Sequence, residues 1–176
     1  MEFRLFYKGT LPAEKCKDTA GPGSGAVGRA RDKHRLRKYF HPQLRELWKQ
    51  DPGLHEQAES YFRIHVTPAN KVDYPGPGVR QIVPVMRGEP LAKRYIDHIA
   101  DAHVYCGNRF VPLVSESGGF TCSLDILFLR RQAPGFGEKG DIDNRIKVLF
   151  DGLRVPKKKA ELGGYSFEPD EDPFFV

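Results

Sequence analysis

The sequence predicts a single α+β domain (α/β mixed) in which helices pack on a mixed β-sheet. Apolar residues alternate over 60–66 and 120–129, which is typical of strands. They recur at three- and four-residue spacing over 29–48 and 141–153, which is typical of helices. A chain of 176 residues also suits one domain, spanning 1–176, with a core of its own.

The N-terminal part is expected to form a strand, a loop and one or two helices. Residues 3–7 alternate apolar and basic side chains, which predicts a strand, and the Gly- and Pro-rich residues 16–28 predict a flexible loop. A basic helix is expected over 29–40, and Pro42 either breaks it or starts a second helix that ends near Trp48. The side chains expected to face the core are Leu36, Phe40, Leu44, Leu47 and Trp48.

The middle of the chain is expected to supply the sheet. Strands are predicted over 60–66 and 79–86, the second at a sheet edge because Pro84 cannot donate a ladder hydrogen bond. The longest strand, 120–129, is apolar on both faces in its second half and is expected to be central, with Cys122 as a small core residue. A helix opening at Pro90 should bury one side, which comprises Leu91, Ala92, Tyr95, Ile96 and Ile99.

The charge distribution favours a polyanionic partner. The net charge is +5 and the pI is about 9.1. Two basic runs stand out, and each is either a solvated face or a phosphate-binding surface. The first run comprises Arg29, Arg31, Lys33, Arg35, Arg37 and Lys38, and the second Arg154, Lys157, Lys158 and Lys159. The residues expected to contact DNA are Arg31, Arg35, Arg37, Lys38, Arg154, Lys157 and Lys158.

Cysteine usage and the absence of apolar runs bear on location. Three cysteines without a close pair argue against a disulfide framework and favour a reducing, cytoplasmic setting. No apolar stretch approaches the length of a membrane span, so no membrane partner is expected. No nucleotide-binding Gly-rich loop and no nucleophile elbow occurs in the sequence, which leaves nucleotide-driven chemistry and serine hydrolysis without support.

The segment from Asp141 to Leu153 carries the chemistry. On a helix with Asp143 at zero, Asn144, Lys147 and Asp151 fall within about 100° of it. The opposite arc is apolar and is expected to face the core; it comprises Ile142, Ile146, Leu149, Phe150 and Leu153. Two carboxylates grouped with a lysine suggest a divalent metal and a phosphate.

The same segment resembles the signature of the RusA-type Holliday junction resolvases. The matching residues are the Asp-Ile-Asp-Asn opening at 141–144, then Lys147, then Asp151-Gly152-Leu153. The resemblance implies a RusA-like fold, a homodimer, and a Mg²⁺ (or Mn²⁺) ion held by Asp141 and Asp143. It also implies that Lys147 is the catalytic lysine and that four-way DNA junctions are the substrate, in recombination and repair.

The resemblance also calls for a third carboxylate in an acidic pair before a strand. Asp172 is the best positional match, with Asp170 as the substitute, and both lie in a segment, 155–176, expected to be a basic and then acidic tail. The sequence ends at Val176, where that strand should begin, so either the protein is a shortened version or its acidic pair lies beyond. Asp172 is therefore a candidate for both metal binding and catalysis.

Structural roles remain open for several of these residues. Asp141 could be a helix N-cap, and Asp143 with Lys147 could be an exposed i,i+4 ion pair. Asn144 is either an orienting residue or a solvated one, and Asp151 could orient Lys147. Asp125, on the predicted central strand, is either a ligand or a hydrogen-bonded structural acid.

Two functions of different classes follow from these residues. The first is a Mg²⁺-dependent, structure-specific endonuclease for branched DNA. The second is a non-catalytic DNA- or junction-binding protein of the same fold that lacks a complete carboxylate set. A metal-stabilised domain with a protein partner is a third, weaker interpretation.

Overall fold

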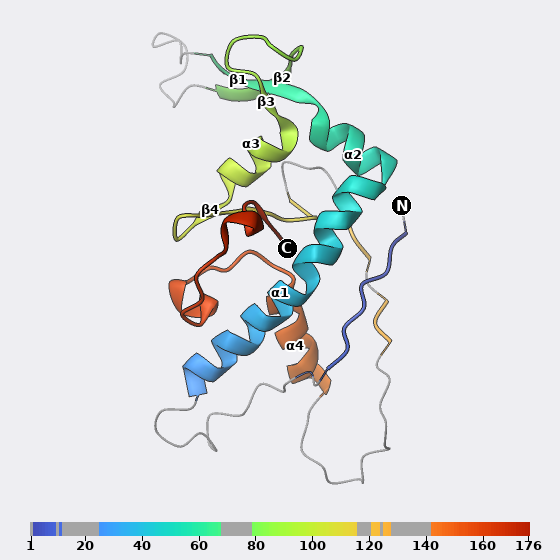
Figure 1. Ribbon diagram of the computed structural model, residues 1–176, viewed down its shortest axis with the longest axis vertical. Coiled ribbons are helices and arrows are strands. Elements are labelled where there is room, and N and C mark those ends of the chain that lie inside the picture. The colour runs from blue at the N-terminus through green and yellow to red at the C-terminus, as the bar shows by residue number, and fades with distance from the viewer. Residues whose placement is uncertain are drawn as a thin grey trace.

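A long helix, α1 (Gly25–Gln50), runs through the computed structural model, and two further helices, a 3₁₀ turn and the C-terminal strand pack against it (Figure 1). The structure describes residues 2–9, 11, 25–67, 79–115, 121–123, 125–127 and 142–176. The further helices are α2 (Pro52–Glu59), α3 (Tyr95–Ala102), α4 (Ile142–Gly152) and the 3₁₀ turns η3 (Lys159–Leu162) and η4 (Pro169–Glu171). The strands are β1 (Tyr61–Thr67), β2 (Val79–Pro84), β3 (Lys93–Arg94), β4 (Val104–Tyr105), β5 (Asn108–Val111) and β6 (Phe174–Phe175).

The described strands form two small sheets, where the sequence predicted one. The first has the order β2-β1-β3 and is antiparallel throughout, with Ile64 opposite Ile82. The second has the order β4-β5-β6, in which β5 pairs antiparallel with β4 and parallel with β6. The α+β class is confirmed, and β2 is an edge strand as Pro84 indicated.

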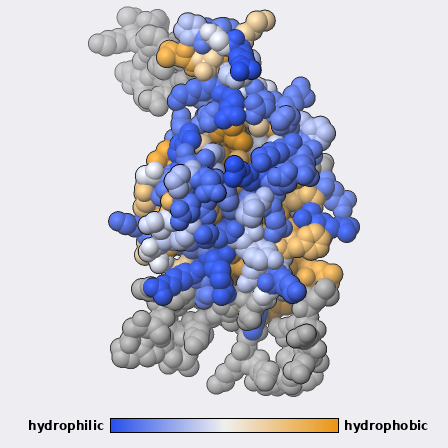
Figure 2. Space-filling model, viewed as in Figure 1, coloured by the Kyte–Doolittle hydropathy of each residue, from blue (hydrophilic) through white to orange (hydrophobic). Residues whose placement is uncertain are grey.

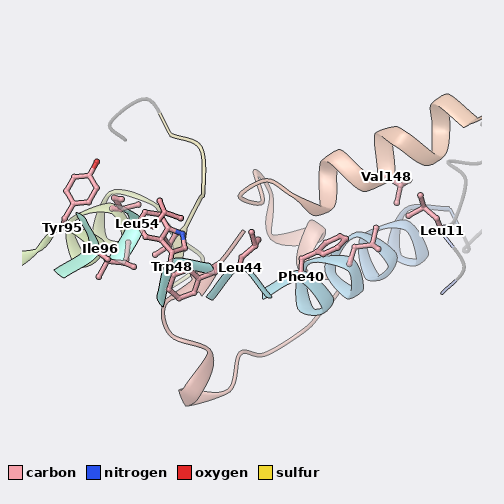
Figure 3. Packing of buried hydrophobic residues seen from close by; sticks show 14 residues of the cluster. Leu11, Phe40, Leu44, Trp48, Leu54, Tyr95, Ile96 and Val148 are labelled. Atoms are coloured by element: carbon pink, nitrogen blue, oxygen red, sulfur yellow. The ribbon is translucent and has the colours of Figure 1, made fainter. Parts of the chain in front are cut away.

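The main core follows one face of α1. Leu36, Phe40, Leu44 and Trp48 are buried at the predicted helical spacing. Figure 3 shows Leu54, Tyr95 and Ile96 beside Trp48, and Val148 and Leu11 beside the other end of the helix. This apolar stripe continues past Pro42, so α1 is one helix and not two; the proline removes a single backbone donor and the packing compensates.

A second, smaller core lies under the C-terminal segment. It comprises Phe110, Leu162, Phe174 and Val176. Backbone hydrogen bonds at the end of β6 join this core to the chain after β5. The N–H of Val176 donates to the carbonyl of Val111, and the N–H of Leu113 donates to the carbonyl of Val176. Residues 155–176, expected to be a basic and then acidic tail, thus end in a buried strand, β6, which lies where a strand was expected after Asp172.

Three predicted elements differ in the structure. Residues 2–8 are not in a strand, and side chains of α1 bind the backbone of Phe6 and Lys8. The helix expected at Pro90 starts at Tyr95, because residues 93–94 form strand β3 and pair with β1. Tyr95, Ile96 and Ile99 are buried as expected, but Leu91 is exposed.

The third difference concerns the predicted central strand. At 121–123 and 125–127, the described part of 120–129, the chain forms no strand. Cys122, expected in the core, is exposed, and so is Asp125. Alternation shows which side chains share a face, but a strand also needs a hydrogen-bonded neighbour, which the sequence pattern does not supply.

Candidate active site and nucleic-acid interface

Helix α4 forms where the motif predicted it, and its buried face overlaps the predicted one only in part: Leu149 and Leu153 pack against the main core as expected. Val148 and Gly152 lie against α1, and a Cβ atom added to Gly152 would lie 2.8 Å from Cβ of Leu36. The absence of a side chain at Gly152 therefore allows α4 and α1 to approach closely. The arc expected in the core is turned partly outward, since Ile142 and Phe150 are 49% and 45% exposed.

The first half of the motif lies on the exposed side of α4. Asp143 and Lys147 are both exposed and lie one helical turn apart. Asp141 lies outside the described residues, as does the side chain of Asn144. The structure therefore places a carboxylate and an ammonium where an anionic ligand and its counter-ion can reach them.

The second half of the motif is part of the packing. The carboxylate of Asp151 forms ion pairs with Lys33 of α1 and with Arg154, the second at 2.8 Å. Burial alone would raise the pKa of Asp151, but the hydrogen bonds from Lys33 and Arg154 outweigh it and hold the pKa below its usual value. The expectation that Asp151 orients Lys147 is replaced by this role, because its ion pairs join α4 to α1.

Arg37 was expected to contact DNA, and the structure contradicts this. Its side chain is 0% exposed. The guanidinium donates to the backbone carbonyls of Asp151 (2.7 Å), Arg154 (3.1 Å) and Glu161 (3.1 Å), and to the Glu161 carboxylate (3.2 Å). Because a planar guanidinium offers five fixed donors, Arg37 satisfies carbonyls at the C-terminal end of α4 and in η3 together.

The other basic residues of the two runs differ in whether other side chains bind them and in how far they are exposed. Arg154 binds Asp151 and Glu161, and Lys38 binds Tyr165 and Glu171. Lys38 also lies 4.1 Å from the centre of the Tyr165 ring, and these interactions hold its ammonium against the C-terminal segment. Lys38 is nevertheless exposed, and so are Arg31, Arg35, Lys157, Lys158 and Lys159. Arg35 also pairs with Asp32 at 3.5 Å.

The fold brings the two basic runs together. Gly163, which follows η3, has φ +61°, and a Cβ atom there would lie 2.8 Å from Cγ of Arg31. The chain after the lysine run thus packs directly on the first turns of α1. Figure 2 shows a mostly hydrophilic face in this view, with hydrophobic residues gathered at its lower right.

Asp172 has a different partner from the expected metal. Its carboxylate accepts hydrogen bonds from Nη2 of Arg109 at 2.7 Å and from Nε at 3.1 Å. Arg109 also lies 3.3 Å from Asp101 and 3.8 Å from Asp97. Among the described residues, no group of three or more His, Cys, Asp or Glu side chains is arranged to hold a metal ion. The cation that Asp172 meets in the fold is Arg109.

Sequence reasoning missed two buried histidines on α1. The ring of His34 lies 4.5 Å from Tyr165, and that of His41 lies 4.2 Å from Phe174, with which it stacks. Nδ1 of His41 accepts the backbone N–H of Phe175 at 2.9 Å, which ties β6 to α1. Their seven-residue spacing, which places both on one helix face, was the available signal.

Comparison with protein-family models, with curated proteins and with solved structures finds no match to this chain. Across the part of the chain that the structure describes, no helix is long and apolar enough to cross a membrane. The function is therefore inferred from the residues and their geometry.

Proposed function

We propose that this protein is a Mg²⁺-dependent endonuclease that cleaves branched DNA, such as four-way junctions in recombination and repair. One observation carries the proposal: the fold uses Asp151 and Gly152 for packing but leaves Asp143 and Lys147 exposed, one turn apart. The spacing of the first half of the motif resembles the resolvase signature.

Asp141 and Asp143 are the proposed metal ligands. Magnesium prefers oxygen ligands, keeps several waters, and is commonly held by one or two carboxylates together with a substrate phosphate. A pair of aspartates at the start of a helix fits that chemistry, although the position of Asp141 lies outside the described residues. When bound, the ion would activate water and offset phosphate charge; Mn²⁺ has the same preference for oxygen.

Lys147 is proposed to bind the phosphate that is cleaved. Its ammonium can donate to a non-bridging oxygen as negative charge builds there. Arg31, Arg35, Lys157 and Lys158 are proposed to bind phosphates farther along the DNA, because they are exposed on adjacent elements. A homodimer would place two such sites on the two strands of a junction. We also propose that the protein acts in the cytoplasm, because free cysteines such as Cys106 and Cys122 suit a reducing compartment.

A second function is favoured by one specific interaction. Because Arg109 binds both oxygens of Asp172, this carboxylate is not available to complete a three-ligand set without breaking that ion pair. A non-catalytic DNA- or junction-binding protein is therefore the alternative. A metal-stabilised domain with a protein partner remains the third interpretation.

A nicking assay separates these functions. The wild-type protein is incubated with a labelled four-way junction or a linear duplex of the same sequence, with Mg²⁺ or with EDTA. Mg²⁺-dependent nicking of the junction supports the endonuclease. Junction binding without nicking selects the non-catalytic protein, and neither binding nor nicking leaves the third interpretation.

A further inference from the structure

The N-terminal segment 2–8 is held along α1 in an extended form. The backbone N–H of Phe6 donates to the Gln43 side chain at 2.9 Å, and the Gln43 amide donates back to Phe6 at 2.9 Å. Two residues on, the N–H of Lys8 donates to the Tyr39 hydroxyl at 3.3 Å. Two residues of the segment thus cover four residues of helix, about 6 Å, which requires a nearly extended backbone.

Burial alternates along this segment. Leu5 and Tyr7 are half-buried and pack against the main core. The opposite side presents Arg4, Phe6 and Lys8, which we call the N-terminal strip. Phe6 is 70% exposed although both its backbone groups are fixed by Gln43. The strip is therefore an exposed aromatic ring between two cations, on a backbone that Gln43 holds at Phe6.

The strip adjoins the proposed DNA surface. Arg35, Tyr39 and Gln43 follow one another at four-residue spacing and so line one side of α1. Lys8 lies over Tyr39, and Phe6 lies over Gln43, so Arg35 is one helical turn beyond Lys8. Tyr39 is itself partly exposed and its ring lies 4.9 Å from that of Tyr7. Cations and aromatic rings thus alternate from α1 to the strip.

The positive charges on both sides of Phe6 favour an anionic partner. Arg4 lies 3.9 Å from Glu2, but both side chains are almost fully exposed, so this pair holds Arg4 only weakly. A lone exposed phenylalanine needs no explanation. Aromatic rings interleaved with cations are the arrangement by which proteins bind unpaired nucleotides, the rings stacking on bases and the cations binding phosphates.

We infer that the N-terminal strip binds an unpaired nucleotide of single-stranded or branched DNA, with the base stacked on Phe6 and the flanking phosphates on Arg4 and Lys8. This inference rests on the proposed function in that it places DNA on α1. It adds an interaction with the base, which an ion-pairing surface alone does not provide. It does not require cleavage.

The test compares two single strands that differ only in their bases. Binding is measured by fluorescence anisotropy for an oligo-dT strand and an abasic strand of the same length. The wild type should bind oligo-dT more tightly, and Phe6→Ala should weaken that binding about fivefold to a hundredfold while changing abasic binding less than twofold. Phe6→Tyr should stay within twofold of the wild type, because it keeps a ring of the same shape.

The control is Met86→Ala, since Met86 is a similarly exposed large apolar side chain. It should leave both affinities unchanged. A wild type that binds the two strands equally, or a Phe6→Ala variant that keeps the preference for oligo-dT, overturns the inference and leaves the proposed function standing. A wild type that binds neither these strands nor a junction overturns both.

Discussion

His34 is a buried titratable side chain that the fold keeps neutral. Its ring is 3% exposed, and within the described part of the chain neither ring nitrogen has a hydrogen-bond partner. Burial, followed by the charges of Arg37 and Lys38, lowers the pKa of His34 to about 4, with Glu171 opposing them. Burial also lowers the pKa of His41, near Glu171, Arg45 and Asp170.

Stability should therefore fall as the solution is acidified. Unfolded His34 takes up a proton near pH 6.5, but folded His34 does not until about pH 4. Its contribution is fully present above pH 6.5 and is lost between pH 6.5 and 4, by about 3 kcal/mol. Urea unfolding at a series of pH values measures this, and His34→Phe should flatten the profile. The exposed His55 is the control: a flattening by His55→Gln alone would contradict this role of His34.

Lys147 should affect turnover more than binding. Its charge matters most as the phosphate becomes more negative, so Lys147→Ala should lower the single-turnover rate roughly a hundredfold and leave junction affinity nearly unchanged. Rapid-quench kinetics at saturating protein separates the two quantities. Weakened affinity at an unchanged rate would make Lys147 a docking residue only.

At the scale of elements, Arg37 joins α1 to the end of α4 and to η3. Arg37→Leu leaves three backbone carbonyls and Glu161 without this donor. The free energy of unfolding should fall by about 3–5 kcal/mol, because the carbonyls lose a buried charged donor and Glu161 keeps only Arg154 as its cation among the described residues. Fluorescence of Trp48, the single tryptophan, reports unfolding in urea.

Arg35→Leu on the same helix is the matched control. The Arg35 side chain is 58% exposed, so this change should alter stability by no more than about 0.5 kcal/mol. Equal effects of the two substitutions would show that burial of Arg37 does not determine the packing of α4.

The sequence predicted a helix correctly where one apolar face determines how that helix packs. The buried face of α1, with Leu36, Phe40, Leu44 and Trp48, followed from their spacing, and the motif helix begins and ends where expected. The bounds of α1 did not follow, because it begins at Gly25, inside the loop predicted over 16–28, and continues past Pro42. The buried face of α4 followed only in part: Leu149 and Leu153 pack against the core as expected, but the contact of Gly152 with α1 carries no apolar signal. Arg37 shares a face with His41 and Leu44, and that spacing was the sign that it faces inward.

Long-range pairing explains the remaining differences at the scale of the whole molecule. Residues 3–7 have the alternation of a strand, but in the structure the backbone of Phe6 is bound by the Gln43 side chain of α1. Asp172 was assigned to a metal from position in the motif alone, and its partner Arg109 is 63 residues away. Neither interaction leaves a local pattern in the sequence.

The surface formed by α1 and the second basic run should make DNA binding depend on salt. A triple variant in which Arg31, Arg35 and Lys157 are all replaced by neutral residues should bind fewer phosphates. The slope of log affinity against log salt should fall by about 0.9 for each phosphate that the variant no longer binds. Lys38 is not included, because Tyr165 and Glu171 hold its ammonium. Anisotropy titrations at several salt concentrations give the slope.

Lys49→Gln provides a control for that experiment. Lys49 is 57% exposed, like Arg35, but lies about 20 Å farther along α1. Its substitution should leave the slope unchanged. If the triple variant keeps the wild-type slope as well, the DNA lies elsewhere on the molecule.

The most direct test of the proposed function is Asp143→Asn, assayed for junction binding and junction cleavage in the same preparation. The amide keeps the shape of the carboxylate but binds Mg²⁺ poorly. The proposal predicts unchanged junction affinity and loss of Mg²⁺-dependent nicking. A variant that cleaves within about tenfold of the wild-type rate, a barrier change of about 1.4 kcal/mol, would contradict a ligand role for Asp143.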